Sequence, residues 1–422
     1  MDQTRNDVYR WVILGTLFAV HVLTSIGQFS IPPLLPFIKK ELGLNYTQVG
    51  VFTSAYYLGV ALTATFAGWM ADLMGVRKMA ISGMVLIGVC TLIASRMPTL
   101  WWIVFFMVLA GISYSVVTPS TNKATMAWFH ERLRAKAMGI KQTGINGGGF
   151  LAALIVPPIA LNFSWRYALA VAAVLVLIGA TATWIFYRDP APAPVHPASP
   201  VRCRPPMREV ISNRNILLLA VEGFFRVGVQ TAFLAYLILY LQNGLKLPII
   251  TAGYFFALAH ASGAVGRIGW GMVSDRILGG QRKMVYLAVA LISGVSFLVF
   301  GNLTPATPLW ILVVVVLIVG FTAVGHQGVG LSLLVEVAGK ECTGTASGFT
   351  QSFYFSGVVL MAPLFGWMVD TFGNYCYAWM ALGLFSFVAS LLVSFVKEGV
   401  RKDSVAVSPG EEIPAEGGFV AR

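Results

Sequence analysis

Charged and amide side chains interrupt apolar stretches in the second half of the chain. Glu222, Arg226 and Gln230 are spaced i, i+4 and i+8, so a helix would present all three on one face. An arginine in such a setting can anchor an anion, and a neighbouring carboxyl group can take up a proton. The other interpretation is a permanent salt bridge between Glu222 and Arg226 along the helix, with no contact to any ligand.

The depth of each charge follows from the helical rise of about 1.5 Å per residue. Counted from the near end of their apolar runs, Glu222 lies about 12 Å deep and Arg226 about 18 Å, while Arg267 lies about 9 Å and His260 about 20 Å deep. We therefore predict two levels. Glu222 and Arg267 form a pair that protonation or substrate can break, and Arg226, beside His260, anchors the anion.

Further polar residues fall inside other apolar runs. Histidine titrates near neutral pH, so His21 and His260, together with Glu222, are the candidates for proton coupling. A neutral histidine bonded to a backbone carbonyl is the alternative for each. Tyr56, Tyr57 and Tyr114 supply either hydroxyls or a stacking wall, with plain packing as the alternative. Lys123 and Lys141 can reach water from near a helix end. The complete set of candidate substrate-binding residues is Arg226, Arg267, His260, Gln230, His21, Tyr114, Lys141, His326 and Gln327.

The composition explains why these charges are unusual. Of the 422 residues, 57% are hydrophobic and only 11% are charged, too few charges to cover a soluble protein of this size. A helix needs about 20 apolar residues to cross a bilayer. That length predicts an all-α membrane protein with twelve spans, at roughly 11–31, 47–71, 79–96, 99–122, 137–161, 165–187, 214–242, 249–273, 284–302, 308–336, 344–370 and 374–396.

A proline-rich stretch divides the spans into two sets of six. Residues 188–213 are predicted to be an extended cytoplasmic linker between an N-terminal bundle, 1–187, and a C-terminal bundle, 214–396, with a cytoplasmic tail at 397–422. Most of the 29 Lys and Arg lie in the loops on the side of both termini, which indicates that this side is cytoplasmic. The net charge of +12 therefore needs no nucleic acid partner.

One sequence pattern occurs in both halves. Gly68-Trp-Met-Ala-Asp72-Leu-Met-Gly75-Val-Arg77-Lys78 returns as Gly271-Met-Val-Ser-Asp275 followed by Gly279, Arg282 and Lys283, with the first glycines 203 positions apart. A carboxylate, a glycine turn and a basic pair at a membrane edge can form a hinge with its own ion pair. The repeat predicts two six-helix pseudo-repeats with a binding site between them.

These features resemble the major facilitator superfamily over nearly the whole chain. The resemblance implies that two halves rock around a central cavity to give alternating access. It also implies gating roles at the cytoplasmic face for Asp72, Arg77, Lys78, Asp275, Arg282 and Lys283. The alternative is that these basic residues only retain the loops inside.

Within the superfamily, Gly266-Arg267-Ile-Gly-Trp270-Gly271 is similar to oxalate/formate antiporters and monocarboxylate carriers. The stretch around Trp128, Pro157-Pro158 and Trp165 resembles anion:cation symporters and cyanate-type permeases. The chain lacks the lysine expected in span eleven of oxalate carriers and the arginine expected in span two of nitrate porters. It also departs from the patterns of drug–proton antiporters.

No phosphate-binding loop, metal cluster or nucleophile–base constellation is present in the sequence. We therefore expect no enzyme, no ATPase, no cofactor and no metal site. The expected function is secondary active transport of a small organic anion, a carboxylate, across the inner membrane by proton-coupled symport, with the lipid bilayer as surroundings and a monomer as the working unit. The alternatives are an anion exchanger, an exporter of lipophilic or cationic compounds, and a sensor on the same scaffold that transports nothing.

Overall fold

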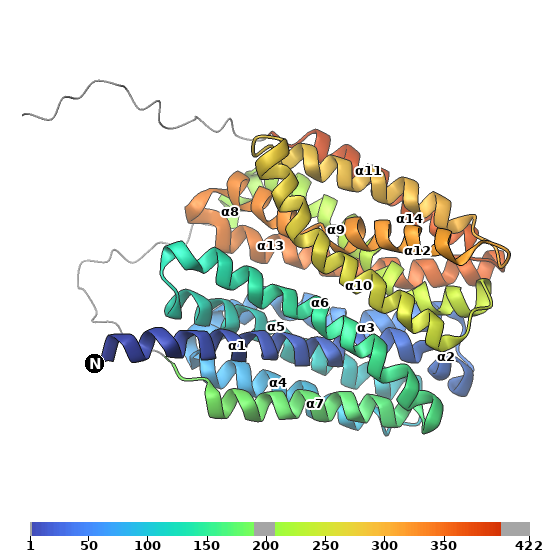
Figure 1. The fold of residues 1–422 in the computed structure, drawn as a ribbon, viewed down its shortest axis with the longest axis horizontal. Helices are drawn as coiled ribbons and strands as arrows, with labels where there is room; N and C mark the ends of the chain where they lie inside the picture. Colours follow the sequence, from blue (N-terminus) through green and yellow to red (C-terminus); the bar gives the residue numbers. More distant parts are fainter. Residues whose placement is uncertain (1, 190–206, 398–422) are drawn as a thin grey trace, which may run out of the picture.

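The computed structural model describes residues 2–189 and 207–397, and it does not describe the side chains of residues 2–8, 65, 67–74, 131, 132, 135, 207 and 340–344. All regular structure in these ranges is helical, and the helices form two groups that lie side by side (Figure 1). The N-terminal half contains α1 (Asp2–Phe29), α2 (Ile31–Leu42), α3 (Tyr46–Met74), α4 (Val76–Ala94), α5 (Leu100–Trp128), α6 (Glu131–Asn162) and α7 (Trp165–Phe186).

The C-terminal half repeats this plan with more irregular helices. It contains α8 (Met207–Ser212), α9 (Arg214–Leu239), α10 (Ile249–Met272), α11 (Arg282–Gly301), α12 (Leu309–Val319), α13 (Gln327–Phe372) and α14 (Cys376–Ser394). Single π-helical turns extend α9, α10 and α12, at Tyr240–Gly244, Val273–Ile277 and Gly320–Val324. Such turns inside α-helices are frequent at functional sites.

The all-α membrane fold predicted from the sequence is confirmed. Eleven helical stretches of the described residues are long and apolar enough to cross a membrane, and α3 is a further helix of 29 residues. The tenth and eleventh predicted spans meet in α13, which changes direction at Gly339, where φ is +72°.

Residues of the predicted linker at 207–212 form the helix α8, so the expectation of an extended chain is wrong there. The rest of that linker, 190–206, and the tail from 398 lie outside the described residues.

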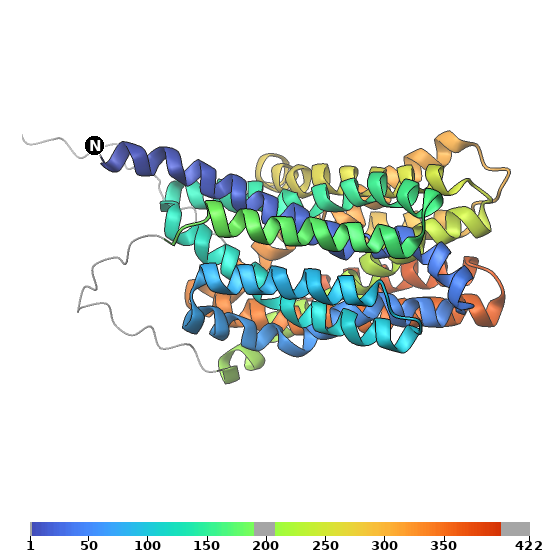
Figure 2. The ribbon, with the colours of Figure 1, turned by 90° about the horizontal axis from the view of Figure 1, so that it is seen from below.

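The bundle has two ends. At the linker end, α7 stops at Phe186 and α9 begins at Arg214, and at the far end the chain passes from α2 into α3 (Figure 1). Long neighbouring helices such as α4 and α7 run along each other between these ends (Figure 2). Because the helices run between these two ends, the position of a side chain is given by its helix and by its distance along that helix from the linker end.

The two halves pack closely at the far end. A side chain at Gly50 would collide with the backbone at Ala362, and one at Gly366 would collide with the backbone at Tyr46, so glycine permits the close contact between α3 and α13. The Tyr236 hydroxyl donates to the carbonyl oxygens of Tyr46, at 2.7 Å, and Ala362, at 3.0 Å. These contacts close the far end of the interface between the halves.

Candidate functional site

A cavity of about 1460 Å³, counting space open to solvent, lies between the two halves. Helices from both halves line it, chiefly α3, α5 and α6 on one side and α9, α10 and α13 on the other. The lining combines neutral polar groups with aromatic rings. The polar members include Gln28, Ser115, Thr118, Gln142, Asn146, Gln230, Thr231, Gln327, Ser347, Thr350 and Gln351, and the aromatic members are Phe29, Tyr57, Tyr114, Tyr286, Tyr354 and Phe355.

Arg267 of α10 lines this cavity and bridges the halves. Its Nη2 donates to Oε1 of Gln327 at 2.6 Å, and its Nη1 donates to the backbone oxygen of Gln142 at 3.3 Å. With the Asn146 amide turned to satisfy its neighbours, the Asn146 oxygen accepts from Nε of Arg267 at 3.3 Å. Among the described side chains, no carboxylate lies within ion-pair distance of Arg267. Neutral groups therefore hold this guanidinium in place while its charge stays uncompensated.

The partner of Glu222 differs from the prediction. Glu222 forms a salt bridge with Arg226, one turn along α9, and both side chains are buried. The Arg226 guanidinium also lies over the ring of Tyr286, 4.2 Å from its centroid. The predicted pair of Glu222 with Arg267 is wrong, because the i, i+4 spacing brings Glu222 to the arginine on its own helix. Arg226 is not among the residues that line the cavity.

The remaining candidates divide into two sets. Gln230, Tyr114, His326 and Gln327 line the cavity with Arg267. Gln327 Nε2 donates to Oε1 of Gln230 at 3.3 Å, and Nδ1 of His326 lies 2.8 Å from the carbonyl oxygen of Ala323. A contact between a histidine ring and a backbone carbonyl is the geometry that the alternative for the histidines expects.

His21, Lys141 and His260 are fully buried away from the cavity. His21 Nε2 lies 3.0 Å from the Thr121 hydroxyl, and Lys141 Nζ donates to the same hydroxyl at 3.3 Å and to the side chain of Asn122. His260 sits between Phe29 and Phe256, with ring centroids 4.6 and 4.8 Å away. Neither of its nitrogens has a hydrogen-bond partner among the described residues. The two sets differ in the direction in which each helix turns its side chains. The depth of a residue along its helix does not give that direction.

Several cavity residues were not predicted from the sequence. Gln28, Gln142, Asn146, Thr231 and Gln351 line the cavity, and an amide or hydroxyl within an apolar run is the signal that would have found them. Sequence reasoning that considers only charged residues and histidines misses these amides and hydroxyls. Tyr57 lines the cavity too, and its ring stacks on that of Phe355.

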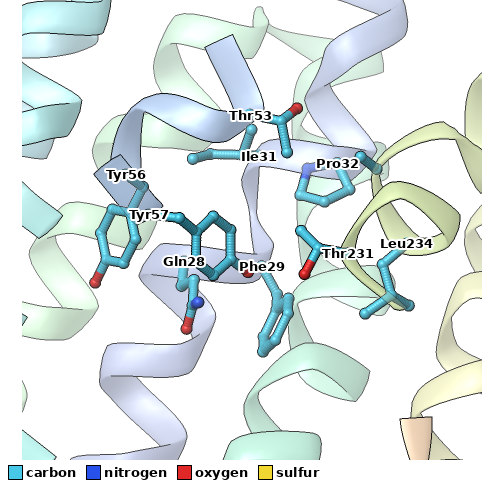
Figure 3. Close-up of a pocket in the computed structure, with 10 residues that line it drawn as sticks. Gln28, Phe29, Ile31, Pro32, Thr53, Tyr56, Tyr57, Thr231 and Leu234 are labelled. Atoms are coloured by element: carbon cyan, nitrogen blue, oxygen red, sulfur yellow. The ribbon is translucent and has the colours of Figure 1, made fainter. Parts of the chain in front are cut away.

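A second, smaller pocket adjoins the cavity toward the far end (Figure 3). It shares Gln28, Phe29, Tyr57, Thr231 and Leu234 with the cavity and holds about 300 Å³ of open space. Figure 3 shows Gln28 and Tyr57 converging from α1 and α3, with Thr231 and Leu234 facing them from α9. These residues form the boundary between the cavity and the closed far end.

The repeated sequence pattern lies at the linker end. In the second copy Arg282 forms ion pairs with Glu336 and, at 3.8 Å, with Asp275, and Lys283 donates to the Ser394 carbonyl at 2.7 Å. In the first copy Arg77 donates to the Trp184 carbonyl at 2.5 Å and Lys78 is exposed. The side chain of Asp72 lies outside the described residues.

Known proteins that resemble this chain indicate its family and the kind of protein it is. The family model of the Major Facilitator Superfamily matches residues 17–360 and 280–416. A probable sulfoacetate transporter of Cupriavidus necator is 24% identical, covering 95% of this chain and 97% of its own length. A gentisate transporter of Corynebacterium glutamicum is 26% identical, covering 85% of this chain and 82% of its own length.

A solved structure shares the fold. The crystal structure of a bacterial homologue of the human lysosomal transporter Spinster, in an inward-facing conformation, superposes with a TM-score of 0.73 at 16% identity. The superposition covers 91% of this chain and 96% of the other. Together with the cavity between the two halves, these matches show that the chain belongs to the Major Facilitator Superfamily and is a multi-pass membrane transporter rather than an enzyme.

Proposed function

We propose that this transporter carries a small organic anion, a carboxylate, and that Arg267 is the group that binds it. The observation that carries the proposal is the charge of the cavity: Arg267 lines it with no carboxylate within ion-pair distance among the described side chains. A buried or partly buried cation without a counter-ion costs free energy, and an anionic substrate would remove that cost. A cationic substrate would instead favour carboxylates in the lining, and none is found among its described residues.

The proposal extends to coupling and orientation. Protons drive symport, with Glu222, His21 and His260 as the groups that take them up. Because none of the three lines the cavity, protonation acts by changing the packing between helices. The basic loops support an inner-membrane protein with both termini in the cytoplasm, which puts the linker end on the cytoplasmic side. One chain contains both halves of the cavity, which supports a monomer as the working unit.

Counterflow into proteoliposomes tests the function. The purified chain is reconstituted with and without a pH gradient and offered a panel of radiolabelled carboxylates, with neutral and cationic compounds as controls. We expect uptake of a carboxylate that rises when the outside is made more acidic. Uptake that ignores the gradient but requires an internal anion would replace symport by exchange, and a response to cations alone would overturn the anion proposal.

A further inference from the structure

The charge balance of the cavity limits the substrate more narrowly than the proposed function does. Among the described residues that line it, Arg267 is the one with a formal charge. Arg226 is neutralised by Glu222, and Lys141 points to Thr121 and Asn122, away from the cavity. Arg267 alone can compensate one negative charge, and a second carboxylate would find only neutral amides and hydroxyls.

Six of the residues that line the cavity are aromatic. Tyr57 from the N-terminal half and Phe355 from the C-terminal half stack on each other, with centroids 6.1 Å apart and an angle of 27° between the rings. Tyr114 lines the same cavity as Arg267, and its ring lies 5.6 Å from that of Tyr56. The positive charge and the flat aromatic surfaces therefore belong to one cavity.

Both halves of the chain line the cavity, so a substrate with a body beyond its charged group can contact them together. Aromatic residues of α3 and α5 in one half and of α13 in the other line it with Arg267. An anion as small as formate would leave the aromatic surface in contact with water. A planar ring would cover it and gain about 0.5–1.5 kcal/mol from each aromatic contact beyond its burial.

Resting on the proposed function, we infer that the substrate is a monoanion with a planar, aromatic body, its carboxylate on Arg267 and its ring against Tyr57, Tyr114 and Phe355. The neutral amides around the ring suit hydroxyl or similar substituents on it. Dicarboxylates and short aliphatic acids are then poor substrates.

Matched ligands test this inference on the purified full chain in detergent, by calorimetry. We expect benzoate to bind about fivefold more tightly than cyclohexanecarboxylate, which lacks the flat ring. Benzamide, without the charge, and terephthalate, with a second charge, are each expected to bind at least about tenfold more weakly than benzoate. If terephthalate, succinate or butyrate binds as tightly as benzoate, the inference fails while the anion function stands. If no carboxylate binds, both fail.

A variant separates the ring contact from general packing. We expect Phe355→Leu to remove most of the preference for benzoate over cyclohexanecarboxylate. Phe353→Leu is the matched control, since Phe353 is on the same helix, packs on Phe349 at 5.1 Å and does not line the cavity. An unchanged preference in Phe355→Leu, or an equal loss in Phe353→Leu, overturns the assignment of the ring site.

A second inference comes from a different observation, a third copy of the repeated pattern. Gly366-Trp-Met-Val-Asp370-Thr-Phe-Gly373 matches Gly68-Trp-Met-Ala-Asp72-Leu-Met-Gly75 at five of eight positions. It ends α13 at the far end, whereas the other two copies lie at the linker end. The third copy carries no basic pair after its glycine, so retention of a basic loop does not explain it.

The carboxylate of this third copy binds across the interface between the halves. Asp370 accepts hydrogen bonds from the backbone N–H groups of Tyr46, at 2.9 Å, and Thr47, at 2.8 Å, and from the Thr47 hydroxyl at 2.7 Å. The two N–H groups are the first of α3, which lack partners within their own helix. A carboxylate is favoured there by the helix dipole as well.

We propose that Asp370 is a latch that holds the far end closed. Separation of the halves at this end must break all three hydrogen bonds and expose the first N–H groups of α3. Loss of the latch therefore shifts the population toward the state in which the far end is open.

Distances between spin labels test the latch. Labels are placed on cysteines at the exposed positions Lys40 and Asn374, one in each half, in a chain whose four native cysteines are replaced by serine. We expect Asp370→Ala to raise the ratio of long to short distances at least about tenfold, and Thr47→Val to raise it less. Asp275→Ala, the same position of the pattern at the linker end, is the control and must not lengthen the distance. An unchanged distribution in Asp370→Ala overturns the proposal.

Discussion

Replacing Arg267 with glutamine is expected to weaken binding of a carboxylate by about 100-fold or more. Removing one partner of a buried, hydrogen-bonded charge pair costs about 2–5 kcal/mol, and each 1.4 kcal/mol is a factor of ten in affinity. Glutamine can keep one hydrogen bond to Gln327, so the local packing is preserved while the charge is lost. The measurement is the affinity of the purified variant for the carboxylate that the proteoliposome panel identifies.

Two further variants define what Arg267 contributes. Arg267→Lys keeps the charge but loses the planar fork, so we expect an intermediate loss of about tenfold. Arg96→Gln removes a positive charge from an exposed position between α4 and α5, and its affinity should equal that of the wild type. An Arg267→Gln variant that binds within twofold of the wild type would end the proposal that Arg267 anchors the anion.

The sequence predicts the helices well and their rotations poorly. Run length and hydropathy determine where a helix crosses a bilayer, which is why the spans around Arg267 and Gln230 were placed correctly along the chain. Depth along a helix does not say which way a side chain points, so His260 was expected in the binding site and instead lies between Phe29 and Phe256.

The pairing of Glu222 shows the same limit. Its depth matched that of Arg267, which suggested a pair between helices, yet the local i, i+4 geometry decided its partner. Arg267 is occupied instead by Gln327 and by the backbone of α6, contacts that no spacing within one run reveals. The neutral residues of the cavity were missed for a related reason, because an amide within an apolar run is a weaker signal than a charge.

The Glu222–Arg226 pair is expected to contribute to stability and not to anion binding. Removing one member of a buried ion pair leaves the other charge without compensation and costs about 3–5 kcal/mol. We therefore expect Glu222→Gln to lower the free energy of unfolding by this amount, measured by chemical denaturation in detergent. The double variant Glu222→Gln/Arg226→Gln should lose less than Glu222→Gln alone, because no buried charge is left unpaired.

An exposed pair provides the control for this experiment. Arg166 and Glu41 lie 3.0 Å apart at the far end, with side chains 27% and 46% exposed, and exposed pairs contribute about 0–1 kcal/mol. Glu41→Gln should therefore change the free energy of unfolding by less than about 1 kcal/mol.

Anion binding by the folded double variant decides between the two roles of Arg226. If Arg226 is structural, the double variant binds the carboxylate as the wild type does, since Arg267 and its partners are untouched. If binding is lost while the variant stays folded, Arg226 belongs to the substrate path, and the salt bridge with Glu222 must open during transport to release it. The single variant Arg226→Gln completes the cycle. If the losses in the free energy of unfolding of Glu222→Gln and Arg226→Gln simply add in the double variant, the two side chains are not coupled.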